Sequence, residues 1–158
     1  MKTASVHEIK QELLQKKPAE LTELCLRMAK FKKENKELLT YLLFEAHNED
    51  GYVGEVKQEM DALFGEINFS HLYFVKKSLR KIVRIINKHT RYIASKQADA
   101  ELRMYFCRLI KNAGIPIEKN TVIKNMYVGQ LDRAEKVIAS IHEDLQYDYL
   151  KEWKTLQL

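Results

Sequence analysis

Residues 67–98 read INFSHLYFVKKSLRKIVRIINKHTRYIASKQA, and the fold predicted for the chain depends on this stretch. Its apolar residues recur mainly at spacings of three and four, which is typical of a helix with one buried side. On a helical wheel this side collects Leu72, Val75, Leu79, Ile82, Val83, Ile86 and Ile93. We therefore predict an amphipathic helix from about Ser70 to Ile93 whose apolar side faces a hydrophobic core.

The same stretch carries the chain's excess positive charge. It has eight Lys or Arg residues and no Asp or Glu, whereas the whole chain has 27 basic and 22 acidic residues. The remainder is therefore slightly acidic. The side of the helix opposite the apolar one collects Tyr73, Lys77, Arg80, Lys81, Arg84, Lys88 and Arg91. With a rise of ~1.5 Å per residue, this basic face is roughly 25 Å long.

The rest of the chain also favours helices. Its 158 residues include five Gly and two Pro, too few for a protein with many tight sheet turns. Helical spacing of apolar residues recurs from residue 6 nearly to the C-terminus, and residues 38–44 are apolar on most sides, which predicts a central helix. We expect seven or eight helices in an all-α fold, forming one helical domain over residues 1–158.

Two arrangements of these helices fit the sequence. Short corners between helices favour antiparallel neighbours. Residues 37–42 (ELLTYL) resemble residues 101–106 (ELRMYF), which favours stacked antiparallel hairpins in a short, right-handed array like an α-solenoid. The alternative is a compact helical bundle. The region after residue 130 contains neither Gly nor Pro and is either one long helix or two helices with a soft bend.

Patterns that would indicate chemistry are missing from the sequence. The five histidines form no HExxH or Glu-x-x-His pair, and there is no Gly-rich phosphate loop and no GxSxG sequence. Cys25 and Cys107 lie in apolar helical patterns, which predicts two buried, reduced thiols. We expect no catalytic residues, no metal and no cofactor, and therefore a protein that is not an enzyme.

Location and membrane contact follow from hydrophobicity. No apolar run approaches the ~18 residues of a membrane span, and the first ten residues lack the apolar core of a signal peptide. Binding of the basic face to a membrane surface is disfavoured, because the apolar side of that helix is needed for the core. The sequence therefore predicts a cytoplasmic protein without membrane contact.

The basic face has several possible roles. A charged outer side is ordinary for an amphipathic helix, but six cations on neighbouring turns repel one another by a few tenths of a kcal/mol per pair. The acidic residues of the segment 45–66 could neutralise them within the chain. Otherwise an external anion could do so, either an acidic protein or the phosphate backbone of a nucleic acid.

We adopt as the expected function a non-enzymatic protein-interaction module that binds through the basic face. Sequence-independent nucleic-acid binding through the same residues is the alternative, with a protein partner preferred. Lys30, Lys32, Lys33 and Lys36 would extend the face if their corner lay near it. The oligomeric state is not predicted.

Overall fold

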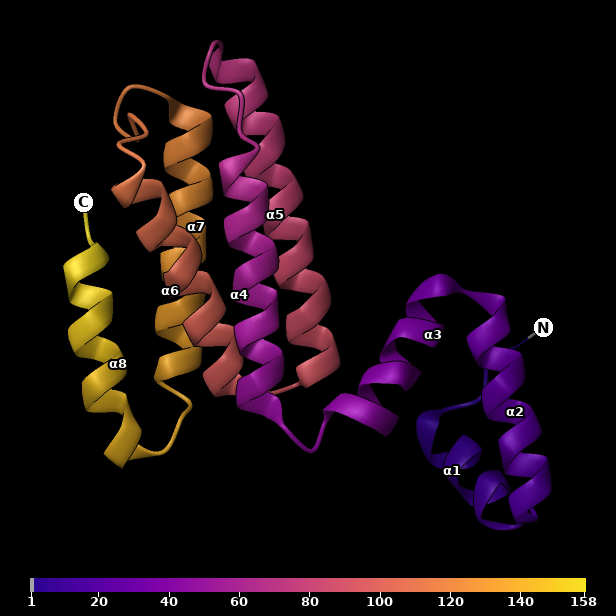
Figure 1. Ribbon diagram of the computed structural model, residues 1–158. Helices are drawn as coiled ribbons and strands as arrows, with labels where there is room; N and C mark the ends of the chain where they lie inside the picture. The colour runs from indigo at the N-terminus through magenta and orange to yellow at the C-terminus, as the bar shows by residue number, and fades with distance from the viewer. Residues whose placement is uncertain (1) are drawn as a thin grey trace. The chain divides into compact units, whose positions relative to one another are not determined.

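The computed structural model describes residues 2–158 and is all-helical over this range. Contacts between residues divide the chain into two compact units, Met1–Glu45 and Ala46–Leu158, here called the N-terminal and C-terminal units. Figure 1 shows the eight α-helices, in agreement with the predicted number. They are α1 (Val6–Leu14), α2 (Pro18–Phe31), α3 (Lys33–Thr40), α4 (Glu49–Gly65), α5 (Leu72–Ile93), α6 (Lys96–Asn112), α7 (Thr121–Ile138) and α8 (Glu143–Leu156), and one π-helical turn, η1 (Tyr41–Glu45), follows α3.

The N-terminal unit begins with a well-capped helix but has little core. The Ser5 hydroxyl accepts a hydrogen bond from the Glu8 amide, and the Glu8 carboxylate accepts one from the Ser5 amide at 2.7 Å, so α1 begins with a capping box. Among residues 2–45, Tyr41 is the only buried side chain. These helices therefore gain little from apolar burial among the described residues.

Two sequence predictions for this unit are wrong. Residues 38–44 were expected to form one central helix, but the helix becomes π-helical at Tyr41, and Leu42, Leu43 and Phe44 are 56–64% exposed. Cys25 was expected to be buried and is exposed on α2. Helical periodicity shows which residues share a side, but it does not show whether another element covers that side.

The C-terminal unit is built around α5 and α6. Helix α5 buries Val75, Leu79, Ile82 and Ile86 to 2% exposure or less, which confirms the predicted amphipathic helix and its apolar side. Helix α6 contacts each of α4, α5, α7 and α8, which lie beside one another in Figure 1. This arrangement fits a helical bundle, whereas a stacked array of repeated hairpins is not confirmed.

The end of the chain forms two helices rather than one. Helix α7 begins at Thr121, where the Asn120 side chain accepts hydrogen bonds from the amides of the first turn, and ends at Ile138. Helix α8 packs back on α7, and the Trp153 indole N–H donates to the Leu131 carbonyl at 3.0 Å. The sequence left open one long helix or two helices with a soft bend, and both predictions are wrong, because the structure has two helices with a full reversal between them.

Two further expectations concern the chain as a whole. Within residues 2–158, none of the helices combines the length and the hydrophobicity that crossing a membrane requires. The single domain over residues 1–158 stays a prediction, and the two units are described separately below.

The corner between α5 and α6 is tight and strained. Ala94 ends α5 in the left-handed conformation, with φ 54° and ψ 24°, and Ser95 then caps α6 by accepting from the Ala98 amide. Left-handed backbone costs a residue with a Cβ atom ~1–2 kcal/mol, which is why glycine is common at this position. The turn brings the side chains on both sides of it close together.

We expect Ala94→Gly to raise the free energy of unfolding by about 0.5–1 kcal/mol. Relief of the left-handed strain exceeds the added entropy of the unfolded chain. Urea denaturation followed by Trp153 fluorescence measures the change. Ala113→Gly is the matched control, because Ala113 also ends a helix but has φ −75°. Equal effects of the two substitutions would contradict the assignment of strain to Ala94.

We also expect amide hydrogen exchange to separate the two units. Helices α1 and α2 contain no buried residues, so their backbone amides should exchange roughly a hundredfold faster, after correction for intrinsic rates, than those of α6. Exchange measured by mass spectrometry on the full chain tests this. Equal protection of α2 and α6 would show that the N-terminal unit is buried in solution.

Candidate functional site

The residues predicted to form the basic face all lie on α5. Tyr73 is 65% exposed. The cations of the basic face are also exposed, except Lys88, which is half-buried. Residues spaced by three and four on one helix keep this arrangement whatever the flanking segments do. The structure therefore brings together on α5 the residues Tyr73, Lys77, Arg80, Lys81, Arg84, Lys88 and Arg91.

The acidic segment before α5 does not pair with most of these cations. Helix α4 packs against α5, yet within residues 2–158 no ion pair joins Lys77, Arg80, Lys81, Arg84 or Arg91 to a carboxylate. Two carboxylates of α4 contact other groups. Asp61 accepts from the Tyr105 hydroxyl at 2.6 Å, and Glu59 lies 3.4 Å from the His89 ring. These five cations are therefore left to solvent or to an external anion.

His89 has a structural role in the contact between α4 and α5. It is 9% exposed, and its Nδ1 lies 2.7 Å from the Tyr52 hydroxyl of α4. Its Nε2 faces the Glu59 carboxylate at 3.4 Å. The imidazole thus connects α4 to α5 and is committed to that contact.

An exposed apolar cluster lies at the N-terminal end of the basic face. Phe69, Leu72, Tyr73 and Phe74 are 40–65% exposed, and the Tyr73 and Phe74 rings meet edge to face with centroids 5.5 Å apart. Sequence reasoning assigned Leu72 to the buried side. Leu72 is exposed because it is the first residue of α5. The sequence pattern does not show how far the neighbouring helices extend toward this end of α5.

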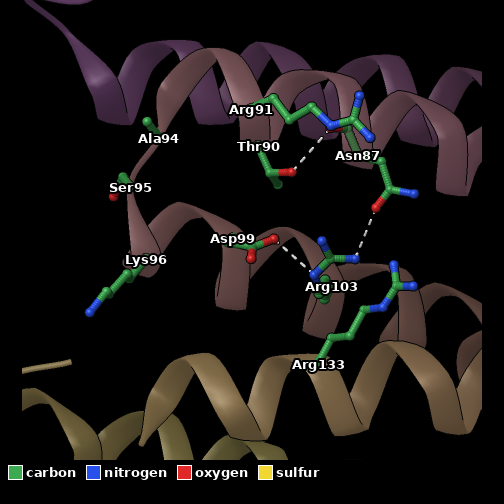
Figure 2. Close-up of a pocket in the computed structure, with 9 residues that line it drawn as sticks. All are labelled: Asn87, Thr90, Arg91, Ala94, Ser95, Lys96, Asp99, Arg103 and Arg133. Atoms are coloured by element: carbon green, nitrogen blue, oxygen red, sulfur yellow. Dashed lines mark hydrogen bonds and ion pairs between the residues drawn. The ribbon is translucent and has the colours of Figure 1, made fainter. Parts of the chain in front are cut away.

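The opposite end of the face leads into a pocket of about 590 Å³ between α5, α6 and α7. Figure 2 shows the residues that line it. They are Asn87, Thr90, Arg91, Ala94, Ser95, Lys96, Asp99, Arg103 and Arg133. Four of these side chains are cationic and one is a carboxylate. Only Arg91 was predicted as a site residue, so the pocket is a finding of the structure.

Arg103 is the central side chain of this pocket and is 6% exposed. Its Nε lies 2.8 Å from the Asp99 carboxylate, one turn earlier on α6. Its Nη1 donates to the Asn87 side chain at 3.2 Å and to the buried Gln130 side chain at 2.6 Å. The guanidinium therefore joins α5, α6 and α7 and is held in one orientation.

The charge of Arg103 is incompletely compensated. Burial lowers the pKa of Arg103, the Asp99 carboxylate opposes this shift, and the positive charge of Arg133 adds to it. Arg133 is exposed and forms no ion pair with the described residues. The pocket thus carries a net positive charge close to a guanidinium that water solvates poorly.

Sequence reasoning missed Arg103 although a signal was present. In ELRMYFCRLI the arginine falls between Leu102 and Met104, and helical spacing places it with Cys107 and Ile110 on a side that is otherwise apolar. A buried Arg must be paired, which marks a polar site inside the bundle. Its partners come from α5 and α7, and no local pattern identifies them.

A second polar cluster joins α4, α6 and α8 and is satisfied internally. Lys57 pairs with Glu101, Arg108 pairs with Glu152, and the Tyr105 hydroxyl donates to Asp61. Burial and this hydrogen bond raise the pKa of Tyr105 to about 12. Each of these charged groups has an opposite charge or, for Asp61, a hydroxyl donor as its partner, so the cluster holds helices together and offers little free charge to a ligand.

Two other predictions concern residues outside the basic face. Lys30, Lys32, Lys33 and Lys36 are exposed in the N-terminal unit, where Lys33 lies 3.5 Å from Glu37. Their proposed role as an extension of the face stays a prediction. Within residues 2–158 no three His, Cys, Asp or Glu side chains gather closely enough to hold a metal ion.

Comparison with known proteins gives no guide to the function of this site. The chain matches no protein family, no curated protein and no solved structure.

We expect Arg103→Gln to lower the free energy of unfolding by about 2–4 kcal/mol, because it leaves Asp99 and Gln130 without their partner inside the bundle. Arg84→Gln removes the same charge from an exposed position and should change stability by ~0.5 kcal/mol or less. Urea denaturation of both variants measures the difference. Similar losses would show that Arg103 is not the cross-link described here.

Proposed function

We propose that this chain is a non-enzymatic helical module that binds an acidic segment of a partner protein through the basic face of α5. The observation that carries the proposal is a set of five exposed cations on α5 that have no carboxylate partner among the described residues. They are Lys77, Arg80, Lys81, Arg84 and Arg91. Like charges on adjacent turns repel one another. The carboxylates of an acidic ligand would attract these cations and offset their mutual repulsion.

The exposed cluster Phe69, Leu72, Tyr73 and Phe74 favours a protein over a nucleic acid. Aromatic residues and arginine are the side chains most enriched in protein interfaces. A partner segment with carboxylates next to apolar side chains would match both parts of this surface. The rigid attachment of α5 to the core supports the proposal, because binding would order few groups of the module itself.

Nucleic-acid backbone binding is the second candidate. The basic face is roughly 25 Å long, and phosphates along one strand recur at ~7 Å, so several cations could reach a backbone at once. Such binding would be independent of sequence, since the face lies along the outside of a bundle and carries no recognised base-reading element.

As part of the same proposal we place the module in the cytoplasm and keep stacked helical hairpins as its finer architecture.

The test compares three labelled probes by fluorescence anisotropy at low and physiological salt: a peptide rich in Glu and Phe, a DNA duplex and a DNA single strand. We expect the peptide to bind most tightly. Arg80→Glu combined with Arg84→Glu should weaken its binding at least ~10-fold, because two attractive contacts become repulsive.

Lys136→Glu combined with Lys151→Glu is the matched control. It makes the same change in net charge at exposed positions on α7 and α8 and should change affinity less than ~2-fold. Tighter binding of either DNA probe, with a steep fall in log affinity against log salt, would favour the nucleic-acid alternative. Failure of all three probes to bind at low salt would rule out both.

A further inference from the structure

We propose that the pocket between α5, α6 and α7 binds a phosphate monoester, with Arg103 and Arg133 holding the phosphoryl oxygens. Phosphate binding here would be separate from the function proposed above, because it requires no protein on the basic face. The pocket shares only Arg91 with that face. Its volume of about 590 Å³ lies within the ~300–1,000 Å³ usual for small-ligand sites.

The first argument is charge. The pocket is lined by one carboxylate, Asp99, and by four cations, so three positive charges remain uncompensated. The cations are Arg91, Lys96, Arg103 and Arg133. Lys96 is partly committed, since its ammonium group donates to the Ser140 carbonyl at 3.2 Å and points away from Arg103 in Figure 2. The other three cations are arginines. A phosphate monoester carries about −1.5 to −2 charges at neutral pH and would neutralise most of this excess.

The second argument is the orientation of Arg103. Asp99 occupies its Nε side, and Asn87 and Gln130 both accept from Nη1. Its Nη2 makes no hydrogen bond with any described residue, so one donor end of a fixed, buried guanidinium remains available. The planar fork of arginine suits the paired oxygens of a phosphate, and here its orientation is already fixed before a ligand arrives.

The third argument is the set of donors around that end. Arg133 extends from α7 toward Arg103 in Figure 2, and Thr90 and Asn87 line the wall formed by α5. The Asn87 Oδ1 accepts from Arg103, which leaves its amide N–H groups to donate. The Thr90 hydroxyl donates to the Asn87 carbonyl at 3.4 Å, so an oxyanion would meet guanidinium and amide donors, which come from three helices. One phosphoryl group fills only part of the cavity, so space remains for the organic group that carries it.

Burial gives the site its energetic basis. Burial disfavours the charged guanidinium of Arg103 most, the Asp99 carboxylate offsets this only in part, and repulsion by the positive charge of Arg133 adds to it. An anion between the two arginines would remove this repulsion. Because Arg103 is shielded from water, its hydrogen bonds to an anion would be stronger than those of an exposed cation such as Arg84.

The test is an NMR titration of the full chain with O-phosphoserine, with inorganic phosphate and with serine. We expect saturable shifts of the Thr90 and Ser95 amides with O-phosphoserine and none with serine. Equal affinity for inorganic phosphate would assign the site to free phosphate, and tighter binding of O-phosphoserine would assign it to a phosphate monoester. Shifts that do not saturate, or that lie away from the pocket, would overturn the proposal.

The variants are Arg133→Gln and its matched control Lys136→Gln. Both remove one exposed cation from α7, but only Arg133 lines the pocket. We expect Arg133→Gln to weaken O-phosphoserine binding at least ~10-fold and Lys136→Gln to change it less than ~2-fold. Arg103→Lys keeps the charge but removes the fork and should weaken binding by a similar factor if folded. Equal effects of Arg133→Gln and Lys136→Gln would show that only net charge attracts the anion.

Discussion

Burial of the apolar side of α5 against the bundle is the constraint on which the rest of the C-terminal unit depends. Once Leu79, Ile82 and Ile86 lie in the core, the helix has no rotational freedom left, and its opposite side must face outward. The cations on that side remain near one another although they repel. Each buried aliphatic side chain contributes ~1.5–3 kcal/mol, which far exceeds the repulsion of a few tenths per pair.

Arg103 shows a different balance between burial and charge. Removing a guanidinium from water is costly, and the structure offsets this cost with Asp99, Asn87 and Gln130 from three helices. These partners fix the position of the side chain without exhausting its donors. A rigid, incompletely compensated cation next to two further arginines is a feature that packing alone does not require, and the proposal of a phosphate site rests on it.

The two units of the chain contrast in what stabilises them. The C-terminal unit has a continuous apolar core and cross-linking polar clusters, whereas residues 2–45 bury only Tyr41 and leave Leu42, Leu43 and Phe44 exposed. Good caps, such as the Ser5–Glu8 box, define where a helix begins but add only about 1 kcal/mol each. Local sequence signals therefore specify the helices of the N-terminal unit without giving it a core.

The sequence alone determined the helical class, the approximate number of helices, and the position and sidedness of α5, because these follow from the spacing of apolar and charged residues along one element. It did not determine that α8 reverses onto α7, that Cys25 is exposed, or that Arg91, Arg103 and Arg133 line one pocket. Only the tertiary structure decided these, because they depend on which helices become neighbours, and side chains from α5, α6 and α7 meet only after the bundle has packed.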